Sequence, residues 1–386
     1  MADKIMHMKV GLARVRPAEA TTRAREVALL EWLNSSLLEE RSGRDKAAPP
    51  LAGPDDSGGL VRTRRQMLAW GAAASLQLRP VRAQGRVLKV GVLPFGTVSW
   101  ETETIRRHAL DAANGFRLDE IKLASSEAAR IAFSSGAVDT IVTDLLWAAR
   151  LRAEGRKVRF LPFSASEGGV MVAPQSTIEH VRDLAARTIG VAGGPLDKNW
   201  LLLRAFALEQ AGFDPSQKSS PVFGAPPLLS HKLEAGELEA ALLFWQFCAR
   251  LKAKGFREVV RAGDIAKSFG ASGEIALLGY LFDEDRGSDP TILADFAAAS
   301  RRAKELLSSS DAAWDSVRPR MQAEDDATFQ VLKRDFVNGI PKRDVSAERA
   351  DAERLFVILA RIGGERLIGP AQTLPAGLYV NAGRGG

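Results

Sequence analysis

The chain has 386 residues, a formal net charge of +6 at pH 7 and one cysteine, Cys248. A single cysteine excludes an intramolecular disulfide and a cysteine-built zinc site. The hydrophobic fraction of 46% is ordinary for globular proteins, so the chain can bury the core of one large or two medium domains.

Residues 1–60 have a composition typical of linkers. They carry nine basic and nine acidic side chains and end in APPLAGPDDSGG. We interpret this segment as disordered, or as an upstream extension that arises because the start codon was assigned too early.

Residues 61–83 carry the features of a twin-arginine export signal in the required order. The pattern TRRQML at 63–68 holds the arginine pair, a weakly apolar stretch covers 67–78, and Val81-Arg82-Ala83 is a small-x-Ala cleavage site. The apolar stretch is too short for a permanent membrane anchor. An amphipathic linker helix is the alternative. We expect cleavage near Ala83 and a periplasmic location.

Cleavage there decides what the basic charge means. The segment holds five arginines and no acidic residue, and residues 1–60 are neutral, so the exported protein has a net charge of +1. A nearly neutral protein is a poor electrostatic match for nucleic acid, and we expect no such partner.

The chain from Arg86 onward alternates between strand and helix patterns. Strands are predicted at Val87–Leu93, Leu118–Leu123 and Val138–Val142, and the second helix begins at Ser125 and Ser126 with a good N-cap. Single helices between consecutive strands predict a parallel sheet with right-handed crossovers.

A second strand–turn–helix unit spans residues 188–210. Ile189–Ala192 is a short apolar strand, Gly193 and Gly194 permit close backbone approaches, and Pro195 suits the first helical position. Gly212 is the expected C-cap. The free amides of this helix start could bind a polar or anionic ligand group. An ordinary strand-to-helix turn is the alternative, because neither the P-loop nor the GxGxxG spacing is present.

Two stretches one hundred residues apart share the same order of helix, glycine, acid, strand and tryptophan. They are residues 126–150 and 226–250, with Asp139 matched by Glu239. We interpret them as two similar α/β lobes; chance similarity is the alternative. The apolar stretches at 164–174 and 272–282 are candidates for strands that cross between the lobes. Helices are predicted at 291–307, 310–318, 323–338 and 347–362.

These features together resemble the periplasmic substrate-binding proteins of ABC importers, in the group that binds sulfonates, taurine, nitrate or thiamine precursors. The resemblance rests on KVGVLPFG, SSGAVDTIVTD, EGGVMVAP, LAARTIGVAGGP and GELEAALLFW. It implies an α/β, two-lobe binding-protein fold of type II, in which each lobe is a mostly parallel sheet flanked by helices. Two strands cross between lobes and the C-terminal tail is helical. One lobe would comprise 84–166 and 283–380, and the other 167–282.

The resemblance also implies where a ligand would bind, because such proteins hold it between lobes, at strand carboxyl ends and helix starts. Asp144 and the tryptophans would suit an aromatic or cationic ligand, whereas no arginine at these strand ends is placed to grip a sulfonate. Core packing is the alternative for each tryptophan. The candidate ligand-binding residues are Gly96, Thr97, Ser99, Trp100, Ser125, Ser126, Thr143, Asp144, Trp147, Gly194, Lys198, Asn199, Trp200, Gly224, Trp245 and Gln246.

The expected function is therefore that of a monomeric solute-binding component that delivers a small organic ligand to an ABC permease in the inner membrane. The alternatives are a periplasmic sensor, an accessory protein of a periplasmic oxidoreductase, or a binder of a metal chelate. We expect no enzymatic activity, cofactor or metal site, because HExxH and GxSxG are absent and no histidine has a second ligand at metal spacing. A pyrimidine-synthase-like enzyme, an activity found in a related branch, is a less favoured alternative, because no Cys-rich catalytic segment is present.

Overall fold

The computed structural model describes residues 86–286 and 291–380, which all belong to one compact unit, Leu78–Gly386. The predicted upstream extension and the export signal lie outside the described residues. Within the described ranges, no helix is long and apolar enough to cross a membrane.

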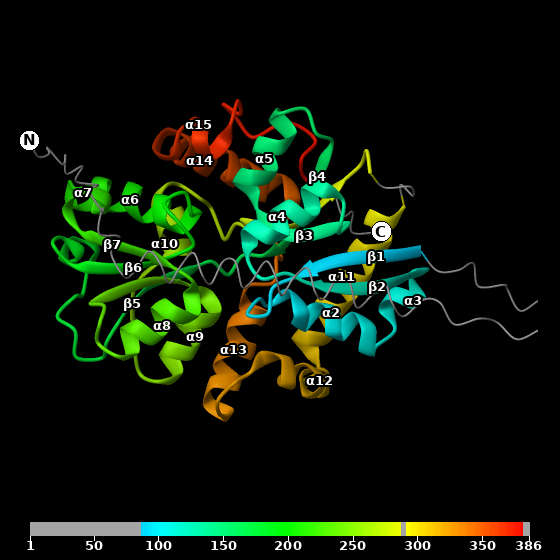
Figure 1. Ribbon diagram of the computed structural model, residues 1–386, viewed down its shortest axis with the longest axis horizontal. Helices are drawn as coiled ribbons and strands as arrows, with labels where there is room; N and C mark the ends of the chain where they lie inside the picture. The colour runs from blue at the N-terminus through cyan, green and yellow to red at the C-terminus, as the bar shows by residue number, and fades with distance from the viewer. Residues whose placement is uncertain (1–85, 287–290, 381–386) are drawn as a thin grey trace, which may run out of the picture. The chain divides into compact units, whose positions relative to one another are not determined.

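The first of two five-stranded sheets has the strand order β2-β1-β3-β10-β4 (Figure 1). Strand β1 pairs in parallel with β2 and β3, whereas β10 runs antiparallel to both of its neighbours, β3 and β4. The strands are β1 (Arg86–Val92), β2 (Phe116–Lys122), β3 (Thr140–Asp144), β4 (Val158–Ser164) and β10 (Leu278–Asp283).

The second sheet repeats this arrangement in the order β7-β6-β8-β5-β9. Strand β6 is parallel to β7 and β8, and β5 is antiparallel to β8 and β9. The strands are β5 (Gly168–Val172), β6 (Thr188–Ala192), β7 (Ser220–Gly224), β8 (Ala240–Phe244) and β9 (Arg257–Arg261).

The one antiparallel strand of each sheet is supplied by chain that has just left the other sheet. The chain passes from β4 to β5 through residues 165–167, and returns from the second sheet to β10 through residues 269–277. These are the two predicted crossings. The two-lobe α/β fold expected from the sequence is therefore confirmed.

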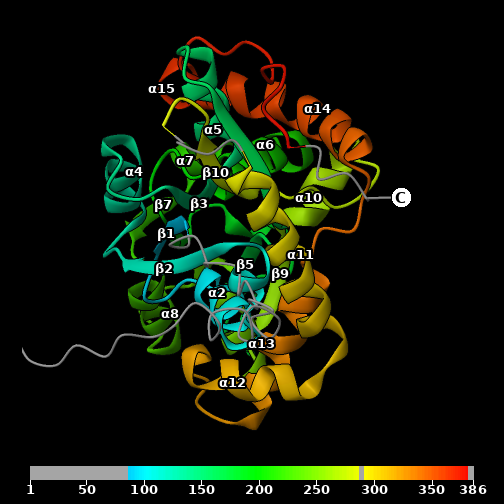
Figure 2. The same cartoon turned by 90° about the vertical axis from the view of Figure 1, so that its right-hand side faces the viewer.

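Helices flank both sheets. We call each sheet with the helices that flank it one half of the protein, and the C-terminal helices contact both halves. Helix α13 packs against α9, and α14 packs against α6, although both follow the first sheet's last strand in the chain (Figures 1 and 2). The helices before β10 are α2 (Val98–Arg107), α3 (Leu110–Ala113), α4 (Ser126–Ser135), α5 (Leu145–Ala153), the 3₁₀ turn η1 (Val181–Leu184), α6 (Lys198–Ala211), α7 (Pro215–Lys218), α8 (Pro226–Glu234), α9 (Trp245–Ala253) and α10 (Ala262–Ser268). Those after it are α11 (Ile292–Ser309), α12 (Asp311–Met321), α13 (Asp326–Asn338), α14 (Val345–Gly363) and α15 (Glu365–Ile368).

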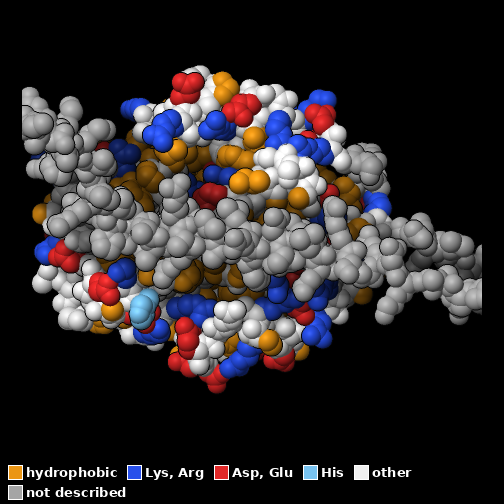
Figure 3. All heavy atoms as spheres, in the orientation of Figure 1, with side chains coloured by type: hydrophobic (Ala, Val, Ile, Leu, Met, Phe, Trp, Pro, Cys, Tyr) orange, Lys and Arg blue, Asp and Glu red, His pale blue; other side chains and the backbone are white. Residues whose placement is uncertain are grey.

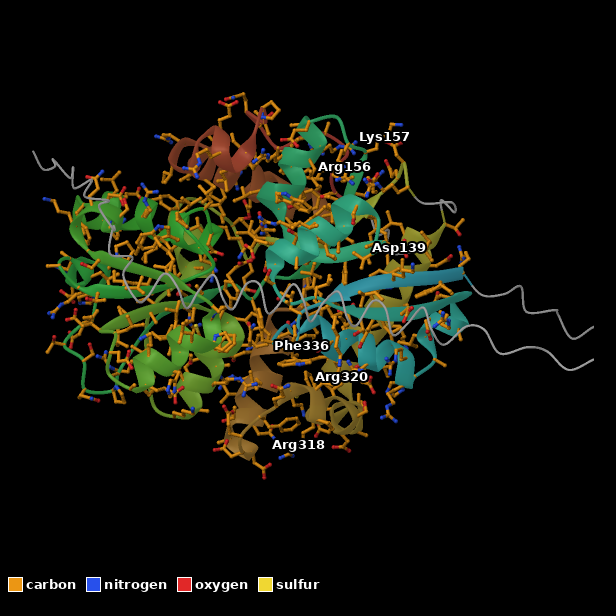
Figure 4. The ribbon with its side chains drawn as sticks, in the orientation of Figure 1. Asp139, Arg156, Lys157, Arg318, Arg320 and Phe336 are labelled. Carbon is orange, nitrogen blue, oxygen red and sulfur yellow. The ribbon has the colours of Figure 1, made fainter. Side chains whose placement is uncertain are left out.

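The predicted internal repeat is confirmed, and its matched acids do the same work in each half. Asp139 Oδ2 accepts a hydrogen bond from the amide of Lys89 at 2.7 Å (Figure 4). Glu239 Oε2 accepts one from the amide of Thr188 at 2.8 Å. Each acid thus holds the strand in second place of its sheet, β1 or β6, to the turn that precedes the neighbouring strand in third place, β3 or β8.

The predicted caps of two helices are confirmed, but two helix starts differ, and α13, expected from 323, begins at Asp326. Ser125 caps α4 by accepting from the amide of Ala128, and Gly212 ends α6 with φ 71°. The prediction that Pro195 begins the helix is wrong: α6 begins at Lys198, and the side chain of Asp197 caps it by accepting from the amide of Asn199. The aspartate side chain satisfies one of the backbone amides that the start of a helix leaves without an intrahelical partner.

Glu348, near the start of α14, is a buried acid behind the crossings. It is 3% exposed, and its Oε1 accepts from the amide of Ala276 at 3.2 Å. Burial raises the pKa of this carboxyl from 4.5 to about 7, although the Ala276 amide and Arg343 lower it in part. The folded protein therefore holds this proton more tightly than the unfolded chain, and the resulting stability is lost as the pH rises from 4.5 through 7.

We predict that Glu348→Gln raises the free energy of unfolding at pH 8 by about 1–3 kcal/mol and changes it little at pH 4. Glutamine keeps an acceptor for Ala276 without the charge. Urea unfolding at both pH values measures this. Glu353→Gln is the control, since Glu353 is half exposed and pairs with Arg349 on the same helix. An equal effect of Glu348→Gln at both pH values would contradict the prediction.

Candidate ligand-binding site

Two interactions between the halves involve residues that directly follow strands. After β1 and β8, the backbone oxygen of Phe95 accepts a hydrogen bond from Gln246 Nε2 at 3.3 Å. After β3 and β6, the charge of Asp144 acts on Lys198. Ligands of open α/β sheets bind at such strand ends, so this boundary is the first place to look for a site.

The most unusual chemistry at the boundary is a buried ion pair between Lys198, at the start of α6, and Glu167, in the first crossing. Their side chains are only 6% and 4% exposed. Glu167 Oε2 pairs with Lys198, whereas neither Glu167 Oε1 nor the amide nitrogen of the 1%-exposed Asn199 has a well-aligned hydrogen bond among the described residues. Buried polar atoms are nearly always hydrogen-bonded, so this cluster has bonding capacity that the described residues leave unused.

The backbone conformation at Gly168 fixes the position of Glu167. Gly168, directly after Glu167, has φ +138°, and a Cβ there would lie 2.1 Å from the backbone oxygen of Leu243. Only glycine fits this approach of the crossing to β8. Glu167 is therefore held against the end of β8 and the start of α6.

Burial strongly affects the protonation of this cluster. It raises the pKa of Glu167, and the nearby Lys198 ammonium offsets only part of the effect. Burial also raises the pKa of Asp197, again against Lys198. Burial lowers the pKa of Lys198, but the carboxylates of Glu167 and Asp197 outweigh it, so the net shift is upward. Lys198 thus stays charged, while the acids around it hold protons more readily than usual.

Asp144, at the end of β3, adds a charged group from the first sheet to the charged residues of the Lys198 cluster. One oxygen accepts from the amide of Trp147 at 2.9 Å, which caps α5, and the other accepts from Arg130 Nη2 at 2.6 Å. The Arg130 guanidinium also lies 5.2 Å from the centre of the Trp147 ring. No arginine was expected here from the sequence, because Arg130 reaches the end of β3 from α4 rather than directly following a strand.

The four candidate tryptophans do not surround one space. Trp100 and Trp245 meet edge to face with ring centres 5.8 Å apart, and both rings also contact Phe336 of α13 (Figure 4). Trp147 packs against Phe133. Trp200 is 1% exposed and packs against Phe223. Three of the four are core residues, and a role of any of them in ligand binding stays a prediction.

A cavity of about 280 Å³ opens beside the Trp100–Trp245 contact. Both halves and the C-terminal helices line it, with Gly96, Gln246 and the exposed His231 among its walls. Arg250 closes one side by donating to the backbone oxygen of Gln322 at 2.8 Å. The cavity and the Lys198 cluster are two separate parts of the same boundary.

The remaining candidate residues have local structural roles. Thr97 is a buried residue at the start of α2, Ser99 donates to the oxygen of Gly96 at 3.2 Å, and the Gly193 amide bonds to the oxygen of Gly224 at 3.3 Å. Thr143 is buried in β3. Ser125 caps α4 and is half-buried, Ser126 is the exposed first residue of that helix, and the half-buried Gly194 lies between β6 and α6. None of these placements tests ligand contact.

Glu167, Arg130 and Asp197 are the site residues that the sequence analysis did not select. Glu167 had a usable signal, because it is a lone acid inside an otherwise small and apolar crossing segment. In the described part of the chain, no group of three or more His, Cys, Asp or Glu side chains could hold a metal ion. Charges of both signs are intermixed on the described surface in Figure 3.

Several solved structures similar to this chain are named as binding proteins. The alkanesulfonate-binding protein of Xanthomonas axonopodis pv. citri, bound to MOPS, is 15% identical, with 77% of this chain and 99% of that chain covered and a TM-score of 0.59. The periplasmic aliphatic sulphonate binding protein of Escherichia coli is 17% identical, with 75% and 90% covered and a TM-score of 0.57. A ligand-binding component of an ABC-type import system from Staphylococcus aureus, with zinc bound, is 14% identical, with 72% and 91% covered and a TM-score of 0.55.

At these identities the likeness establishes the fold. A scan of the sequence against protein-family models finds no match, and a search of curated proteins finds none either.

We predict that Lys198→Gln lowers the free energy of unfolding at pH 7 by about 3–5 kcal/mol, because it leaves the Glu167 carboxyl buried without its cation. The double variant Glu167→Gln/Lys198→Gln should recover most of this loss. Lys254→Gln is the control, since Lys254 pairs with Glu234 at the surface and should cost no more than about 1 kcal/mol. Equal losses in the single and double variants would show that the two side chains do not depend on each other.

Proposed function

We propose that this protein is the solute-binding component of an ABC-type importer, which captures a small organic ligand between its two halves and delivers it to a membrane permease. The observation that carries the proposal is a buried polar cluster in which Glu167 Oε1, in the first crossing, and Asn199 Nδ2, in the first turn of α6, have no well-aligned hydrogen bond among the described residues. Leaving such atoms without partners costs about 1–3 kcal/mol each. A ligand with polar groups would supply those partners, which explains why the cost is tolerated.

The charges favour a ligand with a cationic group. Three carboxylates lie around two cations, so the cluster carries one excess negative charge when all five are ionised. A cationic group balances this excess directly. A purely anionic ligand would require Glu167 to take up a proton and to give up Lys198. The groups concerned are Asp144, Glu167, Asp197, Lys198 and Arg130.

The ligand preference is tested with a thermal-unfolding screen of short alkanesulfonates, taurine and aromatic amines, followed by titration of each compound that binds. We predict that Asp144→Asn weakens cationic ligands about 10- to 100-fold, since a charged hydrogen bond contributes about 1.5–3 kcal/mol. The same change should leave anionic ligands unaffected or improve them. Asp264→Asn, on the exposed surface of α10, is the matched control.

Two results would count against this assignment. If Asp144→Asn and Glu167→Gln/Lys198→Gln both bind every ligand with the affinity of the parent protein, the ligand site lies elsewhere. Tight anion binding that Asp144→Asn does not alter, but the double variant abolishes, would keep the site and reverse the ligand class.

Export is proposed from the sequence, and the solved neighbours named as periplasmic or ABC-import binding proteins support it. We predict that periplasmic material begins at or within a few residues of Gln84, as read by N-terminal sequencing. Replacing Arg64 and Arg65 with lysine should leave the precursor in the cytoplasm, because twin-arginine export depends on that pair. An intact Met1 on periplasmic protein would refute export by this signal.

A further inference from the structure

The two crossings between the sheets are bound by one further stretch of chain, the end of α13 and the start of α14. We refer to residues 335–351 as the α13–α14 connection. Helix α13 packs on α9 and α14 packs on α6, both of which flank the second sheet. The two crossings are where the halves would hinge. The α13–α14 connection is a third segment, separate from the crossings, that contacts them.

The connection holds the first crossing through its backbone. The amide of Ala165 donates to the oxygen of Gly339 at 2.8 Å, and Ser166 Oγ donates to the oxygen of Asp335 at 3.0 Å. A Cβ on Gly339 would lie 2.0 Å from Ser166 Oγ, so only glycine permits this approach. Asp335 is in turn held by Lys252 of α9 at 2.8 Å.

The second crossing is held by side chains of the same connection. Arg343 donates to the oxygen of Glu274 and to Ser272 Oγ, each at 2.9 Å. Asp351 Oδ2 accepts from the amide and hydroxyl of Ser272 at 2.9 and 2.8 Å, and pairs with Arg343 at 2.7 Å. Asp351 is 1% exposed, whereas the Arg343 side chain is 22% exposed, so the buried carboxylate is paired with a cation at the edge of the solvent.

The ring of Phe336, near the end of α13, ties the connection to both halves at once. Its centre lies 5.6 Å from that of Trp100, which follows β1, and 6.3 Å from that of Trp245, which follows β8. Rotation of one half relative to the other would separate at least one of these contacts. A cavity of about 260 Å³, lined by Ala165, Glu274 and Arg343, lies between the connection and the crossings.

We propose that the α13–α14 connection is a clamp that holds the two halves together when no ligand is bound and limits how far they open. Hinge motions of two-domain binding folds are absorbed by a few residues in the crossings. Here those residues donate their amides and hydroxyls to the connection, so opening must break these hydrogen bonds or move the connection with them. The inference concerns the hinge alone and stands whether or not the proposed ligand class is correct.

The test measures the distance between spin labels on the two halves of the ligand-free protein. Ile131→Cys on α4 and Leu228→Cys on α8 place labels at side chains that are 69% and 53% exposed. Cys248 stays unlabelled, because it is buried and burial raises the pKa of its thiol well above the usual range. The pulsed dipolar distance distribution is recorded for the parent, for Ser166→Ala/Arg343→Met and for the control Arg349→Met, whose arginine pairs with Glu353.

We expect one narrow distribution for the parent and the control. Ser166→Ala/Arg343→Met should add a population whose distance is longer by more than about 2 Å. A parent that is already broad, or a double variant that matches the parent, overturns the proposal. If the double variant does not fold, Ser166→Ala alone, which removes a single hydrogen bond, must still broaden the distribution, and its failure to do so is equally decisive.

Discussion

Each sheet of this protein contains one strand that the chain forms directly after leaving the other half of the structure. Strands β5 and β10 lie fourth in the order of their sheets and pair with a strand on each side. Without the strand that follows a crossing, the fifth strand of each sheet would have no neighbour to pair with. The chain therefore passes between the halves twice, through residues 165–167 and 269–277, close to the ends of the strands. This arrangement also places Glu167, which lies in one crossing, directly beside the start of α6.

The buried Glu167–Lys198 pair follows from that geometry and gives the boundary its chemistry. A buried ion pair seldom stabilises a fold more than apolar packing would, so its presence calls for another reason. Glu167 Oε1 and Asn199 Nδ2 have no well-aligned hydrogen bond among the described residues, and the charge of Asp144 acts on Lys198, which provides one: a polar ligand would complete the cluster. The clamp at the α13–α14 connection adds a means of keeping the cluster enclosed until such a ligand enters.

Most of the fold was predictable from sequence because periodicity and turn residues are local signals. The acids Asp139 and Glu239 identified the repeat, and the apolar stretches containing β5 and β10 identified the crossings. The site was less predictable, because its key contacts join distant segments. Arg130 reaches Asp144 from another helix, and nothing near Trp200 in the sequence reveals that its ring is buried in the core.

The central claim is that a ligand binds at the Lys198–Glu167 cluster, and a crystal structure of the protein with a compound that stabilises it tests this most directly. The account predicts ligand density between the end of β3 and the start of α6, with a polar ligand atom within about 3.2 Å of Glu167, Lys198 Nζ or Asn199 Nδ2. Ligand density elsewhere, with the Lys198–Glu167 pair unchanged and still enclosed, would contradict it.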